Sequence, residues 1–421
     1  MRIAYVTPYQ GSTLEQRRPI ARNLSLSNRI KIELVAQLLQ ANGHEVEIIS
    51  DGAVIELGAR FYPGFWETEL SHPDIPVYYV SSLPVRRING FWAGWQAARF
   101  LKKRHRVRPF DLVIILNLRS TQISCASYAI KHLGLPVIFQ YEDDVFVSVS
   151  GEAEEDGWVS RCHRSAYKRI LSSVSGCMAV SPHLLLQLPV HIPKLLLRGV
   201  VGDDVLKTSE DMKAKKRNCV VFSGTHVESN GVSELIAGWE SAAIPRWELH
   251  ITGFGTMTEE LHKMAARDPS IMFHGMISRE ELVRLLCSAR ICINPHVVSQ
   301  TPGNVFAFKI IEYLAAGAHV VTTPMGNLEP GLESGITYMD DNSPATIAAT
   351  LQRVIRERDY ERTAAEAAMQ SYGPEAVSIS LDKLLNKVMA ANNRDQKFVR
   401  ANRSVAGSEV GSQRAGSSNF Q

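Results

Sequence analysis

Residues 303–317 read GNVFAFKIIEYLAAG and are followed by HVVTT at residues 319–323. The pattern predicts a glycine-containing loop, an apolar helix that Gly317 closes, and a β-branched strand. Lys309 and Glu312 are three residues apart, so they lie on one face of the predicted helix. Two interpretations stay open on this local pattern: a surface ion pair within the helix, or a cation and a carboxylate that contact a bound phosphorylated ligand.

Strand-like runs alternate with helical periodicity along the rest of the chain. The apolar run at 3–6, a helix predicted at 28–41 and a strand at 46–49 form a βαβ unit. Further strands are predicted at 77–80, 112–115, 137–139, 177–180, 219–222, 248–251, 271–274, 291–293 and 320–322. This alternation predicts an α/β protein with two Rossmann-like, doubly wound parallel-sheet domains that face a cleft.

The length and the local composition predict how the chain divides, because 421 residues exceed the usual single core. We expect an N-terminal domain over 1–200, a charged linker over 201–217 and a C-terminal domain over 218–372. A helix over 373–392 could return to the N-terminal domain. Few apolar residues follow, so we expect a disordered tail over 393–421.

Composition narrows the class of protein. The apolar content of 45% and the charged content of 21% are ordinary for a globular protein, and a net charge of +3 does not indicate a nucleic-acid binder. Six cysteines without CxxC or Cys/His spacing indicate buried free thiols in a reducing compartment. No signal peptide precedes the first strand, and no apolar run approaches the ~20 residues that span a bilayer. We therefore expect a cytoplasmic protein, at most peripheral on the cytosolic membrane face.

Short motifs recur at strand ends in the C-terminal half. A lone GxG turn is weak evidence, and the third glycine and the acid of a dinucleotide fingerprint are missing, which argues against a dehydrogenase. The motifs in order are FSG at 222–224 with Gly231 seven residues on, ITGFG at 251–255, FHG at 273–275, LL at 285–286 leading to INP at 293–295, and the Lys309/Glu312 helix. This order and spacing resemble the C-terminal domain of GT-B glycosyltransferases, particularly family 4, over about residues 218–360. The N-terminal half resembles the same family more loosely.

The resemblance implies roles for individual residues. Glu312 matches the family's second glutamate, which is expected to hold the donor ribose, and Asn304 stands where the first glutamate of the E-x7-E pattern would contact the donor sugar. Thr225 and Asn230 occupy the places of the Arg and Lys that usually neutralise the diphosphate. Because desolvated phosphate charges need compensation, we expect Lys309 to supply it, helped by backbone N–H groups before the helix. The missing Arg and Lys also fit an inactive, degenerate member.

Additional residues complete the predicted donor site. His296 follows Pro295 at a strand end and either lines the donor pocket or has a structural role. Gly11, after the first strand, fits the loop that lies beside the donor phosphates in the family. The predicted donor-binding residues are Gly11, Gly224, Thr225, Asn230, Gly253, His296, Gly303, Asn304, Val305, Phe306, Lys309 and Glu312.

The stretch YEDD at 141–144 follows a strand of the N-terminal half. Asp143 and Asp144 invite a metal interpretation, but this half faces the acceptor in the family, which does not need a metal for the donor. We expect no metal and no cofactor. Glu142 and Asp143 either cap the next element or orient or deprotonate an acceptor hydroxyl. The predicted catalytic residues are Lys309, Glu142 and Asp143.

A basic, aromatic segment covers residues 86–108, with eight Arg or Lys residues and no acidic residue. It is interleaved with Phe91, Trp92, Trp95 and Phe100. This composition is typical of an interfacial amphipathic helix that contacts anionic lipids. The alternative is that the aromatic side chains pack inward and the basic face is merely solvated. A nucleic-acid surface fits less well, because no recognition motif accompanies it.

The resemblance implies a hexosyltransferase that moves a sugar from a UDP- or GDP-linked donor to a lipid-linked or polysaccharide acceptor, as in cell-envelope polysaccharide biosynthesis. It implies a retaining reaction without a metal. Two alternatives stay open. A GT-B-fold sugar-nucleotide epimerase would need acid/base carboxylates or histidines facing the donor sugar. A non-catalytic scaffold would keep the fold and bind a membrane or a protein.

Overall fold

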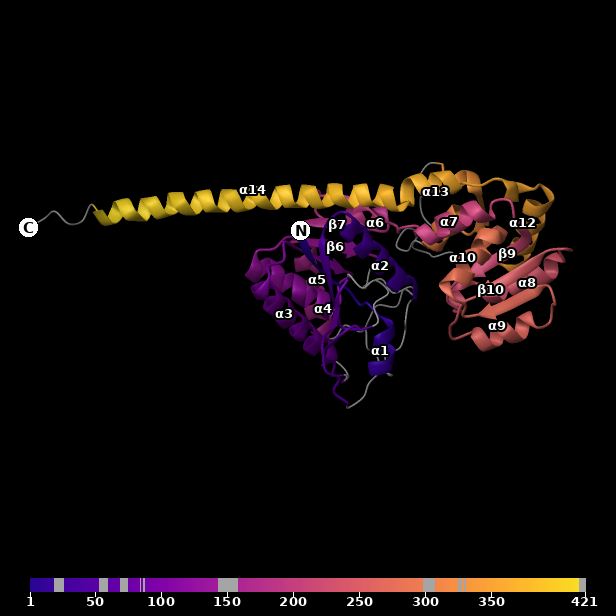
Figure 1. The fold of residues 1–421 in the computed structure, drawn as a ribbon, viewed down its shortest axis with the longest axis horizontal. Coiled ribbons are helices and arrows are strands. Elements are labelled where there is room, and N and C mark those ends of the chain that lie inside the picture. The colour runs from indigo at the N-terminus through magenta and orange to yellow at the C-terminus, as the bar shows by residue number, and fades with distance from the viewer. Residues whose placement is uncertain are drawn as a thin grey trace, which may run out of the picture.

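The computed structural model shows two α/β halves and one long C-terminal helix (Figure 1). It describes residues 1–18, 26–52, 60–68, 75–83, 85, 88–142, 158–297, 307–324, 328 and 331–415, without the side chains of 15, 26–27, 158–164 and 395–415. Each half contains one twisted sheet with helices on both faces, which confirms the predicted fold class.

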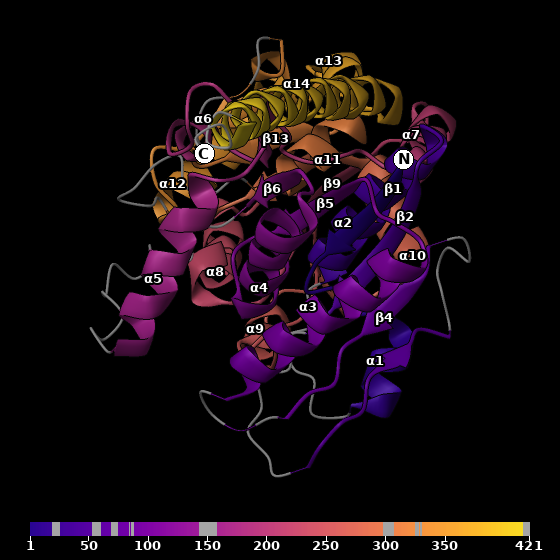
Figure 2. The same cartoon turned by 90° about the vertical axis from the view of Figure 1, so that its left-hand side faces the viewer.

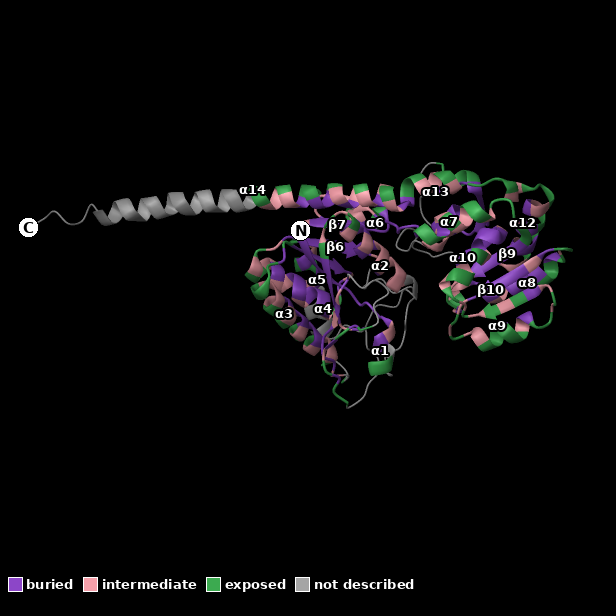
Figure 3. Ribbon diagram, in the orientation of Figure 1, coloured by how far each residue is buried: buried purple, intermediate pink, exposed green. Residues whose placement is uncertain are grey.

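The first sheet has eight strands in the order β3-β4-β2-β1-β5-β6-β7-β8. All neighbours pair in parallel except β3 and β4. Every residue of its central strands β1, β5 and β6 is buried, as expected where helices cover both faces (Figure 3). The strands are β1 (Arg2–Val6), β2 (Glu45–Ser50), β3 (Phe65–Trp66), β4 (Val77–Tyr79), β5 (Leu112–Leu116), β6 (Val137–Tyr141), β7 (Gly176–Ala179) and β8 (Lys194–Leu196).

Helices cover the two faces of this sheet in separate groups. Helix α2 and the start of α14 share one apolar cluster, while α3, α4 and α5 contribute to the other. Helices α3 and α4 lie side by side (Figure 2), and Gly94 permits this because a Cβ there would collide with the Ser124 hydroxyl. The helices are α1 (Ser12–Arg17), α2 (Leu26–Ala41), α3 (Asn89–Val107), α4 (Ser120–Tyr128), the π-helical η1 (Ala129–Leu133), α5 (Trp158–Leu171) and α6 (Pro182–Leu186).

The second sheet has six strands in the order β11-β10-β9-β12-β13-β14, all paired in parallel. Its strands are β9 (Arg217–Ser223), β10 (Glu248–Thr252), β11 (Ile271–Gly275), β12 (Ala289–Asn294), β13 (His319–Thr322) and β14 (Ile336–Tyr338). One face is covered by α7, α10, α11 and α13, and the other by α8, α9 and α12. These helices are α7 (Asp203–Met212), α8 (Val232–Ala242), α9 (Thr258–Ala265), α10 (Arg279–Ser288), α11 (Lys309–Ala315), α12 (Pro344–Arg356) and α13 (Ala365–Tyr372), with 3-10 turns η2 (Glu228–Asn230), η3 (Glu333–Gly335) and η4 (Asp359–Glu361).

The structure contains every strand that the sequence predicts and adds three short ones, β3, β8 and β14. It differs most in the charged segment 201–217, which we expected to be a linker. Residues Asp203–Met212 form α7, and Val205 is buried in the apolar cluster of the second half. A charged segment can therefore be a helix when one apolar stripe finds a partner.

The C-terminal helix α14 (Pro374–Ala415) starts beside α13 and runs across the first half (Figure 1). Val377, Leu381 and Leu385 are buried in the cluster that contains α2. The Asn42 amide donates to the carbonyl of Ser378 over 3.1 Å. The start of this helix therefore packs on the first half, as we expected for residues 373–392. Its helix continues to Ala415, where we expected a disordered tail from residue 393.

Two crossings join the halves at neighbouring points. The N–H of Val201 donates to the carbonyl of Tyr372 over 2.9 Å, so the two connecting segments contact each other. Beside this crossing, Gly199 lies against the ring of Phe308, which a Cβ at position 199 would overlap. The residue that precedes α11 is therefore packed onto the connection between the halves.

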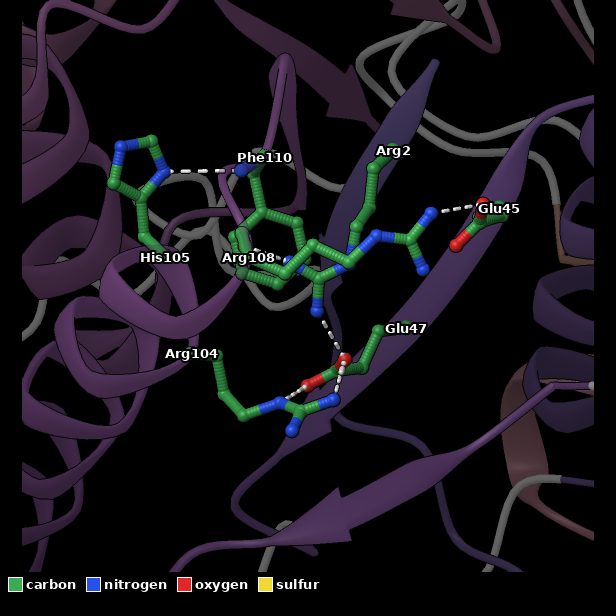
Figure 4. A network of polar contacts seen from close by, with 7 residues as sticks. All are labelled: Arg2, Glu45, Glu47, Arg104, His105, Arg108 and Phe110. Atoms are coloured by element: carbon green, nitrogen blue, oxygen red, sulfur yellow. Dashed lines mark hydrogen bonds and ion pairs between the residues drawn. The ribbon is translucent and has the colours of Figure 1, made fainter.

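A buried ion cluster fixes the basic helix α3 to the first sheet (Figure 4). The Glu47 carboxylate accepts from Arg2 Nη2 at 2.7 Å and from Arg104 Nε at 2.8 Å. Arg2 also donates to the carbonyl of Arg108, and its guanidinium lies 3.8 Å from the ring centroid of Phe110. The cluster fixes how α3 lies on the sheet.

Among the described residues, no helix combines the length and the apolar character needed to cross a membrane.

Candidate functional site

Two glycine loops interlock at the carboxyl ends of β9 and β10. The N–H of Gly224 donates to the carbonyl of Thr252 over 3.1 Å, and the N–H of His226 donates to the carbonyl of Phe254 over 3.1 Å. Gly253 has φ of +133°, and a Cβ there would overlap the carbonyl oxygen of Gly224. A side chain is excluded at this position, and the two loops form one wall where open parallel sheets bind ligands.

A second turn closes the wall on the side of β12. Gly231 has φ of +64°, and a Cβ would collide with the carbonyl oxygen of Pro295. The Asn230 amide donates to the carbonyl of Thr225 over 2.6 Å, which ties the ends of the 225–230 loop together. Thr225 itself is exposed. The predicted residues Gly224, Thr225 and Asn230 therefore share one loop, but the Asn230 amide nitrogen is already bonded to this loop's own backbone.

Helix α11 is pinned against the end of β9. The Tyr313 hydroxyl accepts from the N–H of Ser223 and donates to its carbonyl, both over 3.0 Å. Ile310, Ile311 and Leu314 are buried in the apolar cluster around this hydroxyl. Since the apolar face of the helix is held this way, its Lys309 side chain projects beside the Gly224 loop.

Lys309 is a shielded ammonium without a hydrogen-bond partner among the described residues. The residue is partly exposed, but its Nζ is out of contact with solvent and has no hydrogen-bond partner in the part of the chain that the structure describes. Nζ lies 4.7 Å from the ring centroid of Phe222, and a Cβ on Gly224 would stand 2.9 Å from it. Burial lowers the pKa of Lys309 to about 8. A desolvated ammonium is costly without an anion, so this site is suited to bind one.

Glu312 lies on the same helix, but its carboxylate is paired with another residue than Lys309 and is largely shielded from solvent. Its carboxylate forms an ion pair with Arg279 Nη1 at 2.6 Å, and its side chain is 17% exposed. The hypothesis of a surface ion pair between Lys309 and Glu312 is therefore wrong. The cation goes to the Gly224 loop and the carboxylate to the start of α10, because the helix turns their side chains toward different neighbours.

His296 is held by local contacts just after β12. Its Nδ1 lies 2.8 Å from the carbonyl of Val297, and its own carbonyl accepts from the Thr323 hydroxyl. Burial and the nearby Lys309 charge lower the His296 pKa. A neutral imidazole beside Lys309 leaves that ammonium as the local positive charge.

Gly11 of the first half is packed against acidic and phenolic groups. Its N–H donates to the Tyr79 hydroxyl over 2.7 Å, and that hydroxyl donates to Glu67 over 2.9 Å. A Cβ at Gly11 would collide with the Glu67 carboxylate. The loop needs glycine for this approach, and its N–H group is already engaged within the first half.

Glu142 follows β6 and is held by several partners. Lys31 Nζ forms an ion pair with its Oε1 at 2.9 Å, and the Gln140 amide donates to the same oxygen over 2.6 Å. The Tyr5 hydroxyl in turn donates to Gln140 over 2.5 Å. If Glu142 contacts an acceptor hydroxyl, Lys31 and the acceptor share its carboxylate. The remaining predicted site residues, Asp143, Gly303, Asn304, Val305 and Phe306, lie outside the residues that the structure describes.

Sequence reasoning missed two residues that contact α11. Arg279 reaches Glu312 from a helix 33 positions earlier, and Phe308 packs on Gly199 at the crossing between the halves. Both contacts join segments far apart in sequence. No local pattern signals such a pairing. The Ser278 capping box predicts only that the Arg279 side chain projects from the first turn of α10.

Comparisons with known proteins match both halves. A family model described as "Glycosyl transferases group 1" matches residues 217–357, and one described as "Glycosyl transferase 4-like domain" matches residues 31–189. A search of curated proteins finds no match.

Solved structures share the fold over nearly the whole chain. Sucrose-phosphate synthase from Thermosynechococcus elongatus is similar with a TM-score of 0.66 and 16% identity, covering 93% of this chain and 100% of that one. HepE from Anabaena in complex with UDP-glucose has a TM-score of 0.62 and 15% identity, with 92% and 99% covered. An α,α-trehalose-phosphate synthase (UDP-forming) from Burkholderia xenovorans in complex with glucose-6-phosphate has a TM-score of 0.62 and 12% identity, with 92% and 100% covered.

Proposed function

This chain belongs to the GT-B glycosyltransferases of the family 4 type, since family models of this kind match residues 31–189 and 217–357, and on that premise we propose that it transfers a hexosyl group from a UDP- or GDP-linked donor to a lipid-linked or polysaccharide acceptor. One observation supports the donor site most strongly. The Lys309 ammonium, which no described residue accepts from, lies at the Gly224 loop, at the edge of the sheet where phosphates bind in such folds.

In this proposal Lys309 stabilises the departing diphosphate. The bond from the sugar C1 to the β-phosphate oxygen breaks, the acceptor oxygen bonds to C1, and the acceptor proton passes to the leaving diphosphate. The nearby ammonium stabilises the charge that develops on the diphosphate. Because α11 has only seven residues, we assign this stabilisation to the ammonium rather than to the helix dipole.

The finer points of the proposal rest on the family resemblance. We infer a retaining reaction without a metal or cofactor, in which Lys309 supplies the positive charge, Glu312 holds the donor ribose and the Gly303–Phe306 amides add donors. The family relation to proteins solved with UDP or UDP-glucose supports UDP as the first nucleotide to test. Glu142, held by Lys31, would orient an acceptor hydroxyl together with Asp143.

Replacing Lys309 with Met tests the donor site, because Met keeps the length of the side chain and removes its charge. We expect turnover of a labelled UDP- or GDP-sugar to fall about 10²- to 10³-fold, the usual loss when a charge-stabilising donor is removed. UDP affinity measured by calorimetry should fall as well. Lys263→Met, an exposed lysine of α9, is the matched control and should behave like wild type. Wild-type turnover in Lys309→Met would reject the proposal.

We also propose that α3 contacts an anionic membrane surface where a lipid-linked acceptor resides. Trp92 and Phe100 pack inward, since Trp92 donates to the Ser81 hydroxyl and Phe100 stacks on Tyr78. Phe91 and Trp95 are 62% and 52% exposed, and the Arg99 guanidinium lies 5.5 Å from the Trp95 ring centroid. Exposed aromatic rings beside cations are suited to the headgroup region.

Vesicle sedimentation tests this surface. The double variant Phe91→Ser/Trp95→Ser should lose most binding to phosphatidylglycerol-containing vesicles, because it removes the exposed rings and keeps every cation. Leu186→Ser removes an apolar side chain that is 82% exposed on α6 and is the matched control. Equal sedimentation of wild type and the double variant would show that the basic face is only solvated.

A further inference from the structure

Arg279 joins two carboxylates from different helices. Its Nη1 lies 2.6 Å from Glu312 Oε1 of α11, and its Nε lies 2.8 Å from Asp204 Oδ2 of α7. The side chain of Arg279 is 28% exposed, so the bridge is partly desolvated. Burial alone would lower the pKa of the guanidinium, but the two carboxylates raise it overall, so Arg279 stays charged at any physiological pH.

We propose that Arg279 is the positioning residue that holds Glu312 ready for the donor ribose, and this inference rests on the proposed function. The guanidinium occupies Oε1 of the carboxylate from one side. A carboxylate has about four acceptor sites on its two oxygens, so Glu312 can keep Arg279 and still accept from a ribose diol. The bound rotamer of Glu312 is then present before the donor arrives, and its ordering does not weaken binding.

The surroundings fix Arg279 in turn. Ser278 and Glu281 form a capping box at the start of α10, which sets the backbone from which the guanidinium projects. On its other side Asp204 needs Gly202 as a neighbour, because a Cβ at position 202 would collide with the Asp204 carboxylate. Gly202 lies directly after Val201, the residue bonded to Tyr372 at the crossing between the halves. The ribose carboxylate is thus linked through one guanidinium to the segment that joins the halves.

The neutral variant Arg279→Gln in the full chain tests the inference with UDP as the probe. Without the guanidinium, Glu312 loses its fixed rotamer, and we expect UDP affinity by calorimetry to fall roughly 3- to 10-fold. The donor KM should rise by a similar factor while kcat changes less, because the pair acts on binding. Arg279→Lys, which keeps the charge without the planar fork, should recover part of the loss. Arg284→Gln on the exposed side of the same helix is the matched control.

A nucleotide without the diol separates positioning from general structure. With 2′,3′-dideoxy-UDP as the probe, wild type and Arg279→Gln should bind equally, since the Glu312 contact is then missing in both. When Glu312→Ala is already present, adding Arg279→Gln should not lower the UDP affinity further. A loss of the same size with the dideoxy nucleotide, or an additive loss in the double variant, would overturn the inference.

The controls also distinguish this inference from the proposed function. If Glu312→Ala weakens UDP binding and Arg279→Gln does not, only the role of Arg279 is wrong. If Glu312→Ala binds UDP like wild type, the ribose role of Glu312 is wrong, and Arg279 has no carboxylate to position. Tighter UDP binding by Arg279→Gln would instead show that Arg279 competes with the ribose.

Discussion

The Arg2 cluster of the first half and the Lys309 site of the second half both bury a cation, but they satisfy it differently. Arg2 meets Glu47 at 2.7 Å, and the same carboxylate accepts from Arg104 (Figure 4). Lys309 Nζ has a phenyl ring beside it and, within the described ranges, no hydrogen-bond partner. Arg2 thus has its counter-charge within the fold, whereas in our proposal the counter-charge of Lys309 comes with the donor diphosphate.

Arg18 shows how a buried cation is satisfied without a carboxylate. Its side chain is fully buried, and its guanidinium donates to the carbonyls of Asp51, at 3.1 Å, and Val80, at 2.5 Å. Burial lowers the Arg18 pKa to about 10. Because main-chain oxygens accept from both terminal nitrogens of the guanidinium, Arg18 joins the loops that follow β2 and β4. Among the residues described, none gives the Lys309 ammonium this kind of compensation.

The largest expected effect on stability is at the paired site. Glu47→Gln leaves Arg2 and Arg104 beside a neutral amide in a buried position. Removing one partner of a buried pair typically lowers the free energy of unfolding by about 3 kcal/mol or more. Urea denaturation of the variant should show this loss, while UDP affinity stays at the wild-type value because the cluster is remote from the Gly224 loop. Unchanged stability would mean that the cluster does not hold α3 as described.

The opposite change in the free energy of unfolding is expected at Lys309. Lys309→Met removes a cation that is costly to bury, so the free energy of unfolding near pH 7 should rise by roughly 2 to 3 kcal/mol. The folded pKa of about 8 lies below the ordinary 10.5, so the cost is complete below pH 8 and is relieved as pH rises toward 10.5. Denaturation curves at the two ends of this range should therefore differ for wild type and converge with the variant at high pH. A less stable Lys309→Met protein near pH 7 would contradict this account.

A smaller effect is expected when the missing charge is returned at another position. Thr225 is exposed in the Gly224 loop, at a place where the family usually has Arg. In the Lys309→Met background, Thr225→Arg should recover UDP affinity roughly tenfold, since one charge-assisted hydrogen bond replaces the lost ammonium. Thr225→Ala in the same background is the control and should recover nothing. No recovery with Arg would place the diphosphate away from this loop.

Sequence patterns predicted what depends on neighbours along the chain. The long strands and the helix after residue 307 follow from apolar periodicity, and the Gly224 and Gly253 loops follow from glycines at strand ends. Helix α7 was not predicted, because its apolar residue Val205 is buried by segments far along the chain. The return of the 373–392 helix was expected, but not the contact that fixes it, the hydrogen bond from the Asn42 amide to the Ser378 carbonyl 336 positions away. The Arg279 bridge and the isolation of the Lys309 ammonium likewise arise from distant segments, which local spacing does not encode.

Proton uptake on UDP binding tests the role of the Lys309 ammonium most directly. Calorimetry in two buffers of different ionisation enthalpy, at a pH about half a unit above the Lys309 pKa, counts the protons taken up. If the diphosphate binds the ammonium, wild type should take up roughly 0.7 proton per UDP, because most Lys309 is neutral before binding and charged afterwards. Lys309→Met should take up none at the same pH. Binding of UDP by wild type without proton uptake would contradict the assignment of Lys309 as the counter-charge of the donor.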